Sequence, residues 1–122
     1  MQTCEEIVKS LSEFIRNRVS NKLDLQEVLL FGSYAKGTQH KDSDIDIALV
    51  SERYSECDYL KEYVKAAMLF HDFSFDIEAH LLCPEDLSDD TLFAREVREH
   101  GIVLYSSEKT PGKHRRTVES AQ

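Results

Sequence analysis

The N-terminal part of the chain carries apolar side chains at helical spacing. The motif Thr3-x-x-Glu6 is typical of a helix N-terminus, and the apolar positions that follow recur every three or four residues: Ile7, Val8, Leu11, Phe14, Ile15 and Val19. This pattern predicts an amphipathic helix over residues 4–20, followed by a turn over 21–24. The same periodicity predicts a second helix over 58–70 and a third over 91–99.

Shorter apolar runs between these helices predict strands. Residues 27–31 form an apolar run that ends at a glycine, and residues 44–50 alternate acidic and apolar side chains before becoming wholly apolar. Residues 73–82 alternate with a period of two, and 102–105 predict a last short strand. Helices and strands therefore follow one another along the chain, as in an α/β or α+β domain with helices packed on a sheet.

The remaining segments predict loops and a tail. A short helix or turn is expected over residues 33–38, a polar loop over 39–43 and a turn over 84–87. We expect one domain over residues 1–105. Residues 106–122 contain Pro111 and Gly112 and show no apolar pattern, so they predict a disordered tail.

The charge of the chain restricts its partners. The formal net charge is −8, but residues 106–122 carry four basic and two acidic side chains, so residues 1–105 carry −10. Such a body disfavours nucleic acid as a partner, because phosphate contacts come mainly from Lys and Arg. Any phosphate that the domain handles should arrive with a cation.

The rest of the composition predicts a soluble, cytoplasmic protein. Hydrophobic residues make up 41% and charged residues 31% of the 122 residues, and no apolar run is long enough to span a membrane. The first residues are acidic, whereas a signal peptide begins with basic ones, so we expect the cytoplasm. Three cysteines, Cys4, Cys57 and Cys83, lack metal-site spacing and predict reduced thiols.

Two glycines and two aspartates lie close together in the sequence and raise the question of a phosphate or metal site. Gly32 and Gly37 have the spacing of a P-loop, but Thr38-Gln39 follows where that motif requires Lys and Ser or Thr. Asp44 and Asp46 are separated by one residue, so on a strand both carboxylates project from the same face. Two crowded carboxylates repel each other unless a cation lies between them, and Mg²⁺ prefers such oxygen ligands.

The glycine–serine corner suits a phosphate. Gly32 has no side chain to keep a phosphate from the backbone, and the Ser33 hydroxyl and the start of a helical turn can donate hydrogen bonds to it. Lys36 and Lys41 lie in the same loop, where each could contact a triphosphate or remain solvated. A phosphate loop and a metal-binding strand end are the two halves that a nucleotide–metal complex requires.

Together these residues resemble a known signature. Phe31-Gly32-Ser33, followed after ten residues by Asp44-Ile45-Asp46-Ile47, is similar to the signature of the DNA polymerase beta-type nucleotidyltransferase superfamily, in particular its minimal nucleotidyltransferase branch. The resemblance implies a small mixed sheet with helices packed on one side. It also implies transfer of a nucleoside monophosphate from a nucleoside triphosphate, such as AMP from ATP, to a hydroxyl, with two Mg²⁺ ions held by Asp44 and Asp46.

The resemblance requires a third carboxylate from a later strand. Asp76 and Glu78 both qualify, because they alternate on one face of the strand predicted over residues 73–82, together with His80. We favour Glu78 because apolar residues flank it. This carboxylate would be a metal ligand or the base for the acceptor hydroxyl. His80 could assist the chemistry or bind Glu78.

The sequence leaves the acceptor open. In the minimal branch the partner is commonly an all-helical toxin whose tyrosine is adenylylated, so the resemblance implies an antitoxin role and a homo- or hetero-oligomer. One alternative is a nucleotidyltransferase of the antibiotic-modifying kind, with its acceptor pocket between subunits. The other is a non-catalytic module that keeps the fold to bind a partner.

Overall fold

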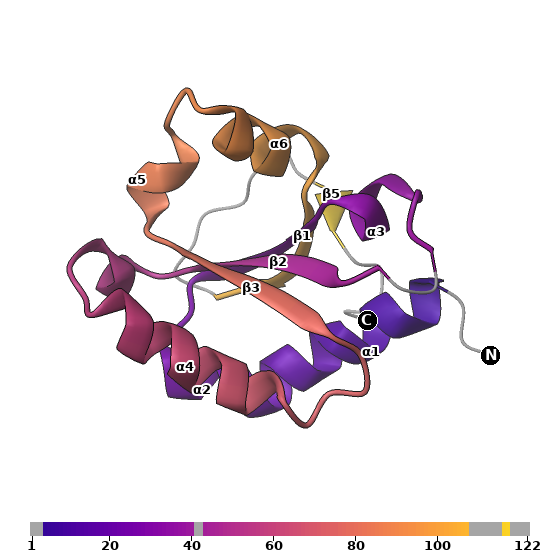
Figure 1. The fold of residues 1–122 in the computed structure, drawn as a ribbon, viewed down its shortest axis with the longest axis horizontal. Coiled ribbons are helices and arrows are strands. Elements are labelled where there is room, and N and C mark those ends of the chain that lie inside the picture. Colours follow the sequence, from indigo (N-terminus) through magenta and orange to yellow (C-terminus); the bar gives the residue numbers. More distant parts are fainter. Residues whose placement is uncertain (1–3, 41–42, 108–115, 118–122) are drawn as a thin grey trace.

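A mixed β-sheet forms the centre of the molecule. The computed structural model describes residues 4–40, 43–107 and 116–117. Its strands are β1 (Glu27–Phe31), β2 (Ile45–Val50), β3 (Ile77–Leu82), β4 (Ile102–Ser106) and the two-residue β5 (Arg116–Thr117), in the spatial order β3-β2-β1-β4-β5. β1 pairs antiparallel with β2 and β4, whereas β2 pairs parallel with β3 and β4 with β5 (Figure 1).

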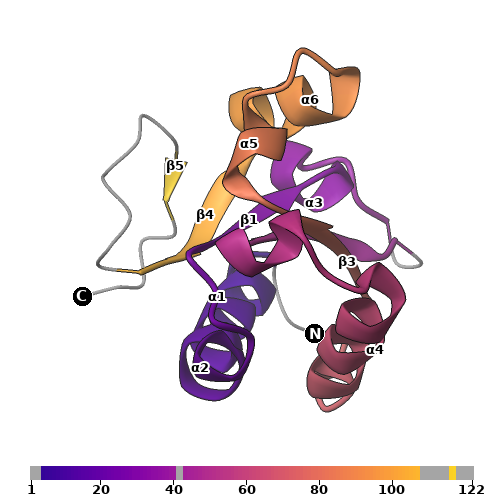
Figure 2. The ribbon, with the colours of Figure 1, turned by 90° about the vertical axis from the view of Figure 1, so that its left-hand side faces the viewer.

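One face of this sheet is covered by the N-terminal helical segment and by α4 (Tyr59–Phe70) (Figure 2). The N-terminal segment consists of α1 (Cys4–Phe14), the π-helical turn η1 (Ile15–Val19) and α2 (Ser20–Leu23). Its buried side chains pack with one set of strand residues in the larger core cluster, which includes Leu11, Ile15, Leu23, Leu30, Ile45, Ile47 and Leu49. This layer provides most of the apolar burial.

The opposite face is covered only in part. α5 (Pro84–Leu87) and α6 (Leu92–His100) lie over it, and the shorter α3 (Ser33–Lys36) follows β1 (Figure 2). The smaller core cluster on this side consists of Leu29, Phe31, Ala48, Val50, Leu87 and Val97. The fold class expected from the sequence is confirmed, and α5 and α6 add a partial second layer that the resemblance did not indicate.

The N-terminal helix is longer than its apolar pattern predicted. It continues through Leu23, which is fully buried, and ends where Asp24 adopts a left-handed conformation with φ 55° and ψ 48°. The turn expected over residues 21–24 was therefore wrong, because burial of Leu23 extends the helix by most of a turn. Thr3 of the predicted capping motif lies outside the described residues.

Other boundaries differ from expectation for local reasons. β3 begins at Ile77 rather than at residue 73, because Phe73 packs against Phe14 and Phe75, with ring centroids 5.3 and 6.0 Å away, instead of extending the strand. The turn expected over 84–87 is one turn of helix, and Glu52–Ser55 form a 3₁₀ turn that the sequence did not indicate. In the predicted tail, Arg116 and Thr117 form β5, and most other tail residues lie outside the described part.

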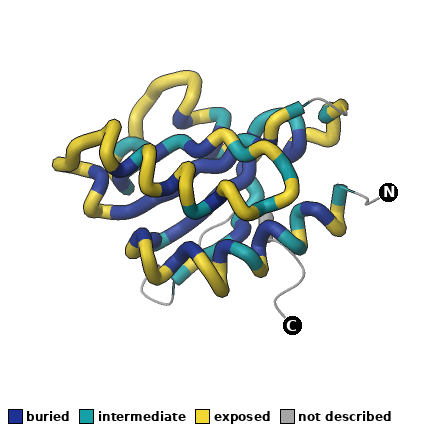
Figure 3. The backbone as a smooth tube through the Cα atoms, turned by 60° about the horizontal axis from the view of Figure 1, so that its bottom comes forward, coloured by how far each residue is buried: buried dark blue, intermediate teal, exposed yellow. Residues whose placement is uncertain are grey.

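The pattern of burial matches this layered arrangement. The strands are buried between the layers, while the outward turns of the helices are exposed (Figure 3). All three cysteines are free thiols, as expected. No helix within the described ranges is both long and apolar enough to cross a membrane.

Candidate active site

Gly32 joins the phosphate-side corner to the carboxylates. It follows β1 with φ 75° and ψ −153°, a backbone conformation that is essentially restricted to glycine. A Cβ atom at this position would collide with the carboxylate of Asp46, whose Cα is paired with that of Phe31 across β1 and β2. Glycine is therefore required at position 32 both by the backbone conformation and by the close approach of Asp46, which the sequence did not indicate.

Gly37 ends the short helical turn that Gly32 begins. The backbone N–H groups of Ala35 and Lys36 donate to the Gly32 carbonyl at 3.1 Å, and that of Thr38 donates to the Ser33 carbonyl at 2.9 Å. Gly37 is left-handed, with φ 76° and ψ 19°, and a Cβ atom there would meet nothing within 4 Å. The two glycines thus lie at the start and the end of one helical turn. This turn accounts for their P-loop-like spacing, although the lysine of a P-loop is missing.

The carboxylates of Asp46 and Glu78 lie on neighbouring parallel strands. The two residues are in register across β2 and β3, so their side chains project from the same face of the sheet, roughly 4.8 Å apart along the hydrogen-bonding direction. Asp44 precedes β2 by one residue and is exposed, as is Glu78, while Asp46 is half-buried. The face that carries them is the partly covered one, beside Phe31 and Ala48.

The charges around Asp46 show which carboxylates are close to it. Burial raises the pKa of Asp46 above its ordinary value, His80 acts against this rise, and the Glu78 and Asp44 carboxylates add to it. His80 Nε2 lies 3.8 Å from Asp46 Oδ1, with 34% and 30% of the two side chains exposed. The structure thus places Asp44 and Glu78 near enough to Asp46 for their charges to act on it, and it pairs His80 with Asp46.

Asp76 occupies a different place. Its backbone carbonyl accepts a hydrogen bond from the Ile45 N–H at 3.0 Å, which aligns the starts of β2 and β3. Asp76 also lines a cavity beside α4, together with Tyr63, Phe73 and Phe75. Of the two candidates for the third carboxylate, Glu78 is therefore the one next to Asp46.

The donor set is suited to a hard cation in its chemistry. Asp44, Asp46 and Glu78 offer only carboxylate oxygens, which Mg²⁺ prefers, and a cation there would offset the part of the rise in the pKa of Asp46 that comes, after burial, from Glu78 and Asp44. Among the described residues, however, no three His, Cys, Asp or Glu side chains converge on one point as a preformed metal site. One Asp46 oxygen faces His80 instead.

Of the other described residues predicted to contact the nucleotide, Ser33 lies at the glycine corner and Lys36 is held by an ion pair. Ser33 begins α3 and is half-buried beside Gly32. Lys36 turns toward α6, where its Nζ lies 2.9 Å from Glu96 Oε2. Lys41 lies outside the described residues.

An aromatic group that lies beside the carboxylates was not predicted from the sequence. Phe31 packs edge-on against His80 and against Phe93 of α6, with ring centroids 5.1 and 5.2 Å away, and His80 lies 5.5 Å from Phe93. Phe93 is 36% exposed. The only signal in the sequence was the position of Phe31 directly before Gly32, because α6 reaches the site through tertiary packing.

Comparisons with known proteins agree with this geometry. Residues 13–110 match the family described as "Polymerase beta, Nucleotidyltransferase". MJ0141 of Methanocaldococcus jannaschii, provisionally named a protein adenylyltransferase, is 31% identical over 101 residues, covering 81% of this chain and 96% of that protein. The protein adenylyltransferase MntA of Shewanella oneidensis is 63% identical, but over only 27 residues, 22% of this chain and 19% of that protein.

Solved structures show the same fold. A provisionally named nucleotidyltransferase from Sulfolobus solfataricus has a TM-score of 0.64 at 19% identity, covering 89% of this chain and 93% of that one. A toxin–antitoxin complex with AMP-PNP has a TM-score of 0.56 at 26% identity, covering 84% and 75%. The family match, which spans most of the chain, together with the relative covered almost in full, shows that this chain belongs to the polymerase beta nucleotidyltransferase family.

Proposed function

We propose that the chain transfers AMP from ATP to a hydroxyl group of a partner protein, namely the tyrosine of a toxin for which it is the antitoxin. The observation that carries the proposal is the contact between the phosphate-side corner at Gly32 and the carboxylates. Gly32, at the phosphate-side corner, lies against Asp46, and Asp46 is in register with Glu78. A triphosphate at the corner would therefore have its phosphates next to the carboxylates.

Each residue has a role in this proposal. Ser33 and the backbone at Gly32 would bind the triphosphate, with Lys36 and Lys41 as further contacts, and Asp44, Asp46 and Glu78 would hold two Mg²⁺ ions. When bound, Mg²⁺ neutralises charge on the attacking and leaving oxygens. Family membership and the oxygen-only donor set support this assignment.

The transfer balances without a further reactant. The acceptor hydroxyl oxygen forms a bond to the α-phosphorus, and the bond between that phosphorus and the oxygen bridging to the β-phosphate breaks, so pyrophosphate leaves. The hydroxyl proton passes to a carboxylate, for which the position of Glu78 next to Asp46 is suitable. Asp76, which lines the cavity beside α4, is the second candidate for this role.

A protein acceptor is supported by the relatives. MntA and MJ0141 are named as protein adenylyltransferases, and structures similar to this one include an MntA–HpeT toxin–antitoxin complex, with a TM-score of 0.55 at 25% identity. A hetero-oligomer with the acceptor protein is therefore part of the proposal.

The proposal is tested by following labelled ATP. The chain is incubated with Mg²⁺ and the protein encoded by the adjacent reading frame, using ATP labelled at either the α- or the γ-phosphate. Label from the α-phosphate should appear on a tyrosine of the partner and should be lost with EDTA, while γ-label should not transfer. Transfer of γ-label, or α-label transfer that survives EDTA, would contradict the proposal.

Site variants make this test specific. Asp44→Asn and Asp46→Asn should each abolish transfer and weaken Mg·ATP binding while the protein remains folded, because relief of carboxylate repulsion offsets the loss of charge. Near-normal transfer by both variants at saturating Mg²⁺ would show that the carboxylates have another role.

A further inference from the structure

The outward face of α4 carries an unusually apolar row. Leu60, Val64 and Met68 lie at positions i, i+4 and i+8 and are 70%, 46% and 71% exposed. Residues at this spacing form one ridge along a helix, about 12 Å long at 1.5 Å per residue. Single exposed apolar residues are ordinary, but a contiguous row of them marks an interaction site. We call Leu60, Val64 and Met68 the α4 ridge.

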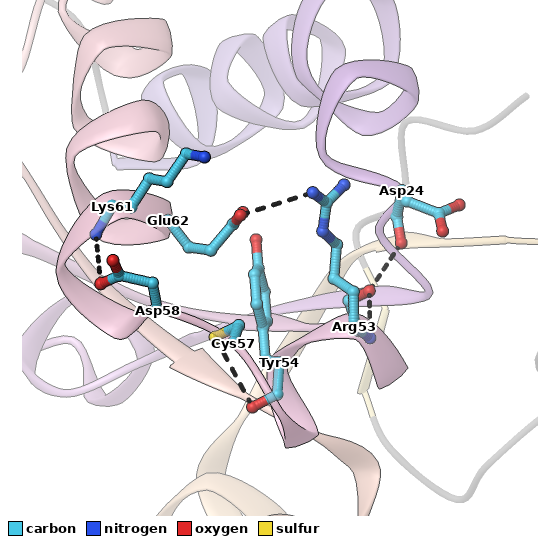
Figure 4. Close-up of polar contacts among 8 residues, drawn as sticks. Asp24, Arg53, Tyr54, Cys57, Asp58, Lys61 and Glu62 are labelled. Atoms are coloured by element: carbon cyan, nitrogen blue, oxygen red, sulfur yellow. Dashed lines mark hydrogen bonds and ion pairs between the residues drawn. The ribbon is translucent and has the colours of Figure 1, made fainter.

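The orientation of α4 on the sheet is well defined, so the α4 ridge is its solvent-facing side. The opposite side of α4 buries Ala66 and Phe70 in the larger core cluster. At the N-terminal end, Asp58 accepts from the Lys61 N–H at 3.3 Å, and buried Glu62 pairs with Arg53 at 3.5 Å (Figure 4). These contacts fix the rotation of the helix and hold the ridge toward solvent.

A small cavity lies beside the ridge. It has a volume of about 180 Å³ and is lined by aromatic side chains, among them Tyr63, Phe73 and Phe75, and by the polar residues His71 and Asp76. Sites for small-molecule ligands measure roughly 300–1,000 Å³, so this one suits a single side chain of a protein partner, such as an aromatic one with a polar end. An anchoring side chain in a pocket, surrounded by a shallower surface, is how protein interfaces concentrate their affinity.

The cavity also extends toward the candidate active site. Asp76 lines it, and the Asp76 carbonyl is bonded to the Ile45 N–H at the start of β2, directly after Asp44. A partner seated on the ridge and in the cavity would therefore lie at the starts of β2 and β3, next to Asp44, on the side of the sheet opposite to the one from which Asp46 and Glu78 project.

The charge next to the ridge indicates the chemistry of the partner. Lys61 and Lys65, one turn apart, flank it, and within the described residues neither ammonium group has an ion-pair partner. Both add positive charge beside the ridge on a chain with a net charge of −8. Complementarity calls for an acidic flank on the partner.

The same charges disfavour a second copy of this chain. In a two-fold antiparallel pair of α4 helices the same patch meets itself, so the flank with Lys61 and Lys65 would face the same two lysines of the other copy. Like charges in contact oppose such a dimer, whereas a different helix with acidic residues satisfies both the ridge and its flank.

We propose that the α4 ridge and the adjoining cavity form the docking surface for an amphipathic helix of the acceptor protein, with an apolar stripe flanked by acidic side chains. The inference rests on the proposed function in one respect, since it takes the acceptor to be a protein. Helix packs on helix by placing the ridge of one in a groove of the other, which the spacing of the α4 ridge allows.

The experiment uses two synthetic helical peptides with the same leucine stripe, one flanked by Glu and the other by Lys, and measures their binding by fluorescence anisotropy. The Glu-flanked peptide should bind the unaltered chain at least tenfold more tightly than the Lys-flanked one. The double variant Lys61→Glu/Lys65→Glu should reverse this preference, and Val64→Asp should abolish binding of both. Lys9→Glu, an exposed position on α1, is the matched control and should change neither.

Two further measurements separate this inference from the proposed function. Val64→Asp should keep normal Mg·ATP binding, and Asp46→Asn should keep peptide binding while losing transfer. If neither peptide binds, if both bind equally, or if sedimentation shows a dimer that Val64→Asp dissociates, the docking proposal is wrong, and none of these results contradicts AMP transfer. If the peptide binds but no AMP is transferred to the partner, the proposed function fails and the docking surface stands.

Discussion

The two faces of the sheet differ in what their side chains do. Along β2, Ile45, Ile47 and Leu49 point into the larger core cluster and are at most 1% exposed. Asp46, between them in sequence, points to the other face, where 30% of its side chain is exposed beside His80. Because a strand alternates its side chains, one six-residue segment provides both stability and candidate chemistry. Changes on the packed face should therefore affect folding, and changes on the open face should affect function.

The largest effect on stability is expected from the packed face. Ile47→Ala should lower the free energy of unfolding by about 2–5 kcal/mol, because Ile47 is fully buried and the truncation leaves a cavity. Urea denaturation measures this change, with Asp46→Asn as the neighbouring control on the open face. A loss below about 1 kcal/mol for Ile47→Ala, or a larger loss for Asp46→Asn, would contradict the division between the faces.

A smaller effect is expected where the open face contacts a turn. Gly32→Ala should destabilise the protein by roughly 1–3 kcal/mol. The backbone conformation of Gly32 is one that essentially only glycine adopts, and the new Cβ would displace the Asp46 carboxylate. Gly37→Ala is the matched control, since Gly37 is also left-handed but has free space, and should cost about 1 kcal/mol.

The two glycine variants should also differ in nucleotide binding. Gly32→Ala should weaken Mg·ATP binding, whereas Gly37→Ala should leave it nearly unchanged. Isothermal titration checks this comparison. Equal losses of both stability and binding in the two variants would mean that the contact with Asp46 has no consequence.

The smallest effect is expected from Tyr54, whose hydroxyl is a buried polar group on the packed face. Tyr54 lies in the larger core cluster, and its buried hydroxyl, like Oε1 of Glu62, has no hydrogen-bond partner among the described residues. Burial, and after it Glu62, raises the pKa of Tyr54 to about 12, while Arg53 opposes the rise. Tyr54→Phe should therefore leave stability near neutral pH unchanged or slightly higher, because it removes an unsatisfied group.

The raised pKa gives this variant a pH signature. Below the ordinary tyrosine pKa of about 10, the folded and unfolded states both keep the proton and stability is unaffected. Between pH 10 and 12 the unfolded state loses the proton first, so the parent protein loses stability there and Tyr54→Phe does not. Thermal melts of both proteins from pH 8 to 11 measure the difference. Parallel curves would show that Tyr54 ionises at its ordinary pH.

Local patterns in the sequence predicted most of the fold. β1 was predicted with the bounds that the structure shows, and α4 and α6 within one residue at each end, because Gly32, Asp58 and Thr91 mark those boundaries. The end of α2 and the start of β3 were wrong, because tertiary burial of Leu23 and Phe73 decides them and local pattern does not.

The candidate site was predictable to a similar extent. The spacing from Gly32 to Asp46 indicated that both belong to one site, and the structure places them in contact. The pairing of His80 with Asp46, the approach of Phe93 and the ion pair of Lys36 with Glu96 were not predictable, because each depends on where β3 or α6 lies in space. The choice between Asp76 and Glu78 depended on register, which only the pairing of β2 with β3 defines.

That choice is also the most direct test of the proposed chemistry. We would measure single-turnover transfer of α-labelled AMP by Glu78→Gln and Asp76→Asn side by side, together with Mg·ATP binding. Because Glu78 is the carboxylate in register with Asp46, Glu78→Gln should slow transfer by several orders of magnitude and largely keep nucleotide binding, while Asp76→Asn should remain close to the parent rate. A slow Asp76→Asn with an active Glu78→Gln would assign the role to Asp76, and normal turnover by both variants would contradict catalysis by a three-carboxylate site.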